Sequence, residues 1–234
     1  MDLSYRVLAP LFMDIAVIFL LVGMIMNTGI FRKRGRTDDR LFFLLLVIDA
    51  LVAACDAAGY YVDGKHFPGA NALNLLFLNL YYMLLLLFAY VWVLYLDHRL
   101  YGSEERTKKA AKLLLVPVAL FELLYIVGIP GKWFFFVDGS NRYGYGPGYI
   151  YPVLVAVVYG VAGLFLNLMH ERQTGKAGKV PTVMLLVPVV VALVVSYAFG
   201  GVSMVSESLA AMLTYLHSGS MNETFHGRRD CDVQ

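Results

Sequence analysis

The apolar residues of this chain lie in uninterrupted blocks, and this arrangement limits what it can fold into. Six blocks of roughly 20 residues each match the length that a helix needs to cross about 30 Å of hydrocarbon. We place them at residues 9–30, 41–61, 72–96, 113–130, 149–169 and 181–199. Charged residues make up only 15% of the chain, against about 25% in a soluble domain. The sequence therefore predicts an all-α, polytopic integral membrane bundle.

A seventh crossing is expected at residues 202–217, although this segment is short and carries Glu207 and three serines. The alternative is a cytoplasmic or interfacial helix. Seven crossings put 15 of the 19 lysines and arginines on one side and four on the other, and the basic side is normally cytoplasmic. We therefore expect a seven-helix domain over residues 1–217, with the N-terminus outside, the C-terminus cytoplasmic and a short disordered polar tail over residues 218–234.

Motifs of known chemistry are missing from the sequence. The first block is too long for the apolar core of a signal peptide and is followed by no A-x-A site, so we expect it to be retained. Cys55 and Cys231 are too few for a disulfide framework. Because no H-E-x-x-H, P-loop, G-x-S-x-G or dinucleotide fingerprint occurs, we expect no catalytic residue, cofactor, metal or nucleic-acid partner.

An aromatic segment, FFFVDGSNRYGYGPGYIYP, occupies residues 134–152 between two apolar blocks. In the seven-helix topology it faces outward. One interpretation is an interfacial aromatic belt with a glycine- and proline-rich turn, which needs no ligand. The other is that Asn141, Tyr143 and Tyr145 contact a ligand.

Five acidic residues lie inside the apolar blocks or the weaker seventh segment, where no lysine or arginine accompanies them: Asp14, Asp49, Asp56, Glu122 and Glu207. An ionised carboxylate at the bilayer centre costs at least about 2.5–3.5 kcal/mol. These groups are therefore expected to be protonated, hydrated in a cavity or hydrogen-bonded. Asp49 and Asp56 share one helix face about 10 Å apart, among alanines that allow close helix packing. They serve either a ligand pocket or interhelical hydrogen bonding.

Polar residues of the third block enter the membrane from the same outer side. If Asn74, Asn79 and Tyr82 reach the same depth as the acids of the second helix, they form a binding cleft open to the outer loops. The candidate ligand-binding residues are therefore Asp49, Asp56, Asn74, Asn79, Tyr82, Glu122, Asn141, Tyr143 and Tyr145.

Three stretches together resemble a known family: LFFLLLVIDALVAACDAAGYY after a basic loop, FFFVDGSNRYGYGPGYIYPVLVAVVYG with Asn141, Tyr143, Gly146 and Pro147, and SESLAAMLTYL. This order is similar to the seven-helix membrane input region of bacterial GGDEF-type diguanylate cyclases and some histidine kinases. The resemblance implies a sensor in the bacterial cytoplasmic membrane that binds an extracytoplasmic or membrane-borne small ligand.

The resemblance stops after residue 217, because the 17 residues that follow are too few for a cyclase or kinase core. We expect either a shortened form of a longer sensor or a stand-alone sensor that signals to a separate cytoplasmic cyclase or kinase. The bilayer and a second copy of the chain are further expected partners. A small proton-coupled transporter, with the intramembrane acids as relay groups, and a structural or assembly partner of another membrane protein are the alternatives.

Overall fold

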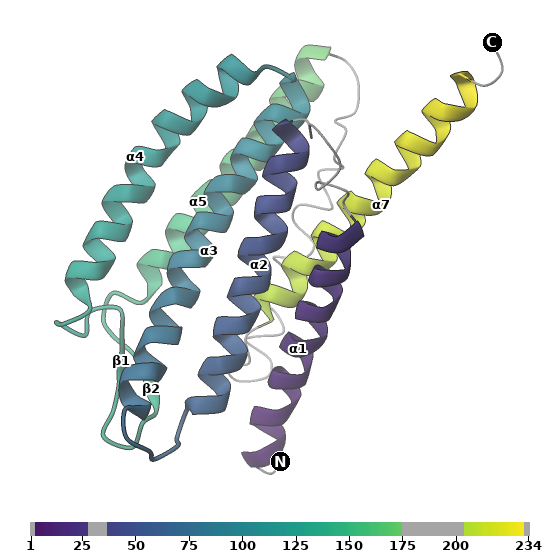
Figure 1. Cartoon of the computed structure of the whole chain (residues 1–234). Coiled ribbons are helices and arrows are strands. Elements are labelled where there is room, and N and C mark those ends of the chain that lie inside the picture. Colours follow the sequence, from purple (N-terminus) through teal and green to yellow (C-terminus); the bar gives the residue numbers. More distant parts are fainter. Residues whose placement is uncertain (1–2, 28–36, 175–203, 232–234) are drawn as a thin grey trace.

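A computed structural model of the chain describes residues 3–27, 37–174 and 204–231, with helices as its main elements (Figure 1). The helices are α1 (Leu3–Asn27), α2 (Thr37–Val62), α3 (Ala70–Tyr101), α4 (Glu104–Gly128), α5 (Ile150–Thr174) and α7 (Val205–Cys231). The prediction of an all-α fold is confirmed.

Five of these helices, α1 to α5, are long and apolar enough to cross a membrane, and they correspond to the first five predicted blocks. The sixth block, residues 181–199, lies outside the described residues. Large apolar side chains point outward from the bundle, among them Phe19 of α1 and Leu113 and Val127 of α4, which are 75%, 74% and 68% exposed. Such surfaces are typical of contact with lipid or protein, so the chain has the features of a multi-pass membrane protein.

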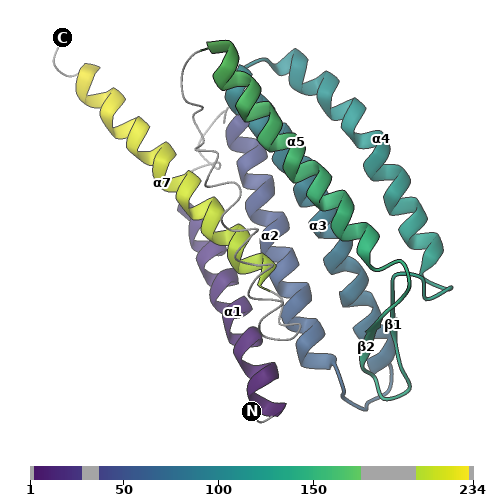
Figure 2. The same cartoon turned by 180° about the vertical axis from the view of Figure 1, so that it is seen from behind.

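The long central helix α3 organises the bundle. It packs against α2, α4 and α5, whereas α1 and α7 pack against each other and against α2. Helices α1, α3, α5 and α7 run in one direction, and α2 and α4 run in the other (Figures 1 and 2). The interior between α2 and α3 is filled by fully buried aliphatic side chains such as Leu45, Val52 and Leu96.

The two ends of the bundle differ. The N-terminus of α1, the α2–α3 connection and a small β-hairpin lie at one end, which we call the hairpin end (Figures 1 and 2). The α3–α4 connection and the last turns of α5 and α7 lie at the opposite end. The α3–α4 turn is tight because Gly102 takes a left-handed φ of 65° and Ser103 caps α4 by accepting a hydrogen bond from the Arg106 amide.

Helix α7 is longer than the segment predicted to cross the membrane. It continues as a helix to Cys231, through residues for which the sequence predicts a disordered tail. No proline interrupts residues 205–231, and polar composition alone does not exclude a helix. The first half of α7 packs against α1 and α2, and its last turns extend past the bundle (Figures 1 and 2).

The aromatic segment contains a β-hairpin, which the sequence analysis did not predict. Strands β1 (Phe135–Val137) and β2 (Tyr143–Tyr145) pair antiparallel, with Phe135 opposite Tyr145 and Val137 opposite Tyr143. Aromatic and β-branched residues favour strands, and the pairing satisfies backbone groups that an irregular loop would leave exposed. Strand β1 of the hairpin packs against the first half of α3.

Candidate functional site

A cavity of about 80 Å³ lies beneath the hairpin and brings together five of the nine predicted ligand-binding residues. We call it the hairpin cavity. It is lined by Cys55, Asp56, Gly59, Tyr60 and Asp63 from the second half of α2 and its end, by Asn74, Leu78, Tyr81 and Tyr82 of α3, and by Tyr143 and Tyr145 of β2. Its volume is sufficient for a few water molecules or a small polar molecule.

Aromatic rings form the wall between α3 and the hairpin. The Tyr82 ring stacks on Phe135 with ring centroids 4.0 Å apart, and Tyr81 meets Tyr82 edge to face at 5.0 Å. Tyr145 contacts the rings of Phe135 and Tyr143 at 5.9 and 5.8 Å. Ring pairs of this kind stabilise a contact beyond the area they bury, so the wall is held in one arrangement.

Asn141 fastens the hairpin to the α2–α3 connection. It takes a left-handed φ of 57°, which asparagine tolerates better than most residues, and it is fully buried. Its Nδ2 donates hydrogen bonds of 2.8 Å to the carbonyl oxygens of Val62 and Lys65. The structure therefore uses this predicted ligand-binding side chain to position the hairpin, outside the lining of the cavity.

Asn74 and Asp63 connect the cavity wall to the same junction. Asn74 Nδ2 lies 3.0 Å from both Asp63 Oδ1 and the Asn141 carbonyl oxygen. Asp63 Oδ1 also accepts a 3.0 Å hydrogen bond from the Tyr143 amide. The sequence analysis missed Asp63 because it follows the apolar block. The available signal was an acidic residue two positions after a pair of tyrosines, on the side of the bundle that faces the aromatic segment.

The turn of the hairpin is organised by Asp138, whose Oδ1 accepts hydrogen bonds from the Arg142 amide and from the amide and hydroxyl of Ser140. These donors, with the Arg142 amide first, lower the pKa of Asp138, which is fully exposed. Burial, followed by the neighbouring Tyr145, raises the pKa of Tyr143. Tyr143 is therefore neutral at physiological pH, and its hydroxyl is hydrogen-bonded to that of Tyr145.

Three of the predicted residues lie away from the hairpin cavity. Asn79 donates to the Leu75 carbonyl of its own helix at 2.5 Å. Glu122 is half-buried on α4, one turn from the buried Tyr125. Asp49 belongs to a second group of polar residues deeper in the bundle.

We call this second group the acid cluster, and it consists of Asp14 of α1, Asp49 of α2, and Ser206 and Glu207 of α7. The Ser206 hydroxyl lies 2.9 Å from Asp14 Oδ1 and 3.3 Å from Glu207 Oε2. Asp49 is fully buried, and neither of its carboxyl oxygens has a hydrogen-bond partner among the residues that the structure describes. Within the same residues, no lysine or arginine forms an ion pair with the three acids.

Asp56 lies between the two groups. Its side chain lines the hairpin cavity, and it is close enough to Asp14 to interact electrostatically with it. In the described ranges, no three histidine, cysteine or acidic side chains are placed to hold a metal ion.

Comparisons of the chain with models of protein families, with curated proteins and with solved structures give no match.

Proposed function

We propose that the chain is a membrane-embedded sensory module that binds a small polar ligand in the hairpin cavity. The observation that carries the proposal is the meeting of Asp56, Asn74 and five tyrosines in one cavity roofed by a hairpin. A carboxyl, an amide, hydroxyls and ring faces together suit a small molecule with hydrogen-bond donors, such as a small amine. Opening of the hairpin would enlarge the space for a bulkier ligand.

The topology assigned to this sensor has seven crossings, the hairpin end outside and the opposite end in the cytoplasm. Two observations support it: the helices alternate in direction through the described part of the bundle, and the basic loops follow that alternation. The membrane would be the bacterial cytoplasmic membrane, as the resemblance to sensor input regions implies. A separate cyclase or kinase would receive the signal.

The signal would pass from the cavity to α7. A ligand shifts a conformational equilibrium only by its different affinity for two states, and the two states here differ in how the hairpin and Asp56 are arranged. Asp56 interacts with Asp14, and Asp14 accepts the hydrogen bond that holds Ser206 of α7. Loss of the Asp14–Ser206 hydrogen bond would let α7 move relative to α1 and α2.

The test is a thermal-shift screen of the purified full chain against small amines, amino acids and sugars. A ligand that binds only the folded state raises the unfolding temperature. We expect Asp56→Asn to abolish the shift given by a hit, while Glu122→Gln, a matched change in an acid outside the cavity, leaves it intact. A screen without hits, or equal loss in the two variants, would contradict the proposal.

A proton-coupled carrier is the second candidate, and the acid cluster favours it. Buried carboxyls without basic partners in the described structure are typical of proton relays in membrane proteins. This function predicts pH-driven uptake of a substrate into proteoliposomes that falls when Asp49 is changed to Asn. Unchanged uptake in Asp49→Asn, or no uptake by the wild type, would remove the carrier hypothesis.

A further inference from the structure

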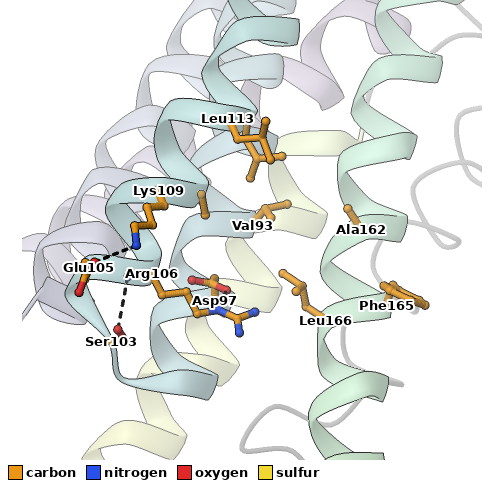
Figure 3. A pocket seen from close by; sticks show the side chains of 12 residues that line it. Val93, Asp97, Ser103, Glu105, Arg106, Lys109, Leu113, Ala162, Phe165 and Leu166 are labelled. Atoms are coloured by element: carbon orange, nitrogen blue, oxygen red, sulfur yellow. Dashed lines mark hydrogen bonds and ion pairs between the residues drawn. The ribbon is translucent and has the colours of Figure 1, made fainter.

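A groove of about 580 Å³ opens between α4 and α5 (Figure 3), and it shares no lining residue with the hairpin cavity. We call it the α4–α5 groove. Its apolar walls include Val93 of α3, Leu113 and Leu114 of α4, and Ala162, Phe165 and Leu166 of α5. The volume falls in the range of about 300–1,000 Å³ that small-molecule sites occupy.

The groove exists because α4 and α5 both pack on α3. A Cβ at Gly163 would come within 2.8 Å of the Leu96 side chain, so glycine allows α5 to approach α3 closely at this level. One turn nearer the hairpin end, the Tyr159 hydroxyl donates a 2.7 Å hydrogen bond to the Leu114 carbonyl of α4. This contact bounds the groove on that side, and its walls belong to two helices apolar enough to span a membrane.

The mouth of the groove is polar and lies at the end of the bundle opposite the hairpin. Arg106 and Lys109 of α4 line it together with Asp97, Ser103 and Glu105 (Figure 3). Arg106 is held in place by Asp97, with Nε 2.8 Å from Oδ1, and by the Tyr101 ring 3.5 Å from its guanidinium carbon. Since a guanidinium carries five N–H donors, this ion pair leaves its terminal nitrogens able to donate to another acceptor.

Lys109 is also able to contact a ligand. Its ion pair with Glu105 measures 2.8 Å, but the two side chains are 77% and 82% exposed, and exposed pairs of this kind contribute little. Lys108 and Lys112 add positive charge to the same helix. Basic residues next to a membrane span attract anionic lipids.

From this geometry we propose that the α4–α5 groove binds an anionic phospholipid of the adjoining leaflet. One acyl chain lies along Leu113, Phe165 and Leu166, and the phosphate is contacted by Arg106 and Lys109. The apolar groove opens sideways toward the hydrocarbon, and its mouth lies where the apolar part of α4 begins. The first turns of α4, residues 104–112, carry four basic and two acidic side chains, so an excess of positive charge stands next to the apolar walls, which is the charge order that a phospholipid requires. The inference requires α4 and α5 to be in the membrane and is independent of the sensory function.

The experiment is native mass spectrometry of the full chain in detergent, titrated with phosphatidylglycerol or with phosphatidylcholine of the same acyl chains. We expect the wild type to prefer phosphatidylglycerol. Lys109→Gln should weaken its binding about tenfold, which corresponds to the loss of one charge-assisted hydrogen bond, and Lys109→Arg should retain it. Lys108→Gln is the matched control, because Lys108 is 76% exposed and paired with Glu104 four residues before it, yet does not line the groove.

Ala162→Phe tests the apolar part, because the larger side chain fills the groove; it should reduce binding of both lipids. Equal binding of the two lipids by the wild type would overturn the proposal. Equal weakening by the Lys108 and Lys109 variants would show attraction to surface charge alone and would also overturn it. Unchanged lipid binding in Ala162→Phe, with the wild-type elution profile, would place the lipid elsewhere on the protein.

Discussion

Single side chains at the hairpin end determine whether the cavity exists. Asn141 joins three segments: its own turn, the end of α2 through Val62, and the following loop through Lys65. Its backbone carbonyl accepts further hydrogen bonds from the Gly64 amide and from Asn74. Because these carbonyl oxygens are buried, water cannot replace a hydrogen-bond donor that is lost. Each carbonyl oxygen left without a donor destabilises the folded state by about 1–3 kcal/mol.

The change Asn141→Asp should release the hairpin, since a carboxylate would face two carbonyl oxygens in place of the amide donor. We expect the docked state to lose at least about 2 kcal/mol, which raises the undocked fraction roughly thirtyfold. Trypsin cleavage after Arg142, which is exposed in the hairpin turn, measures that fraction. Asn71→Asp, the same change at an exposed asparagine of α3, is the control; equal cleavage rates in the two variants would contradict this role of Asn141.

At this scale the sequence predicted part of the site. Five of the residues that it named, Asp56, Asn74, Tyr82, Tyr143 and Tyr145, line one cavity; that they bind a ligand stays a prediction. The role of Asn141 could not be predicted, since its side chain bonds to backbone 79 and 76 positions away. Backbone carbonyls are present at every residue and give no signal in a sequence.

Among the elements, the hairpin depends on glycines that let the chain cross itself. A Cβ at Gly146 would press against the carbonyl oxygens of Lys132 and Trp133, and one at Gly148 would approach the Trp133 ring to 2.8 Å. The amides of the same two glycines donate to the carbonyls of Phe134 and Trp133 at 2.8 and 2.7 Å. The Gly-Pro-Gly sequence thus brings the start of α5 close to the end of α4.

Gly146→Ala should push apart the two chain segments that cross here. We expect the free energy of unfolding to fall by about 1–3 kcal/mol, the range for overpacking at a tight contact. The expected result is a lower unfolding temperature. Unfolding is monitored by the fluorescence of Trp133 in a Trp92→Phe background. Gly139→Ala in the hairpin turn meets nothing within 4 Å and should leave that temperature unchanged. A Gly146→Ala variant as stable as Gly139→Ala would show that the crossing is not tight.

For the whole molecule, the apolar blocks predicted five helices well because a membrane crossing needs only length and hydrophobicity. The blocks did not predict how far helices continue beyond the apolar core. Helix α2 begins at Thr37 and α4 at Glu104, in polar sequence, because a helix satisfies its own backbone in water as well as in lipid. The same reason explains the continuation of α7 through residues predicted to be disordered.

The predicted orientation is tested with an impermeant maleimide on intact cells. In a background with Cys55→Ala and Cys231→Ala, His66→Cys in the α2–α3 connection should be labelled directly, and Lys108→Cys only after permeabilisation. In a Cys55→Ala variant, native Cys231 should behave like Lys108→Cys if seven segments cross. Labelling of Cys231 from outside would leave six crossings and remove the proposed cytoplasmic output.

The geometry of α7 has a mechanical consequence. Its 27 residues span about 40 Å, and Ser206 in its first turn meets Asp14 of α1. The helix is thus a lever whose fulcrum lies among carboxyl groups. A tilt of about 5° at the fulcrum moves the far end by roughly 3–4 Å, given the rise of 1.5 Å per residue. If the chain is a sensor as proposed, rearrangements too small to alter the bundle would be amplified into displacements as large as the separation of two packed side chains.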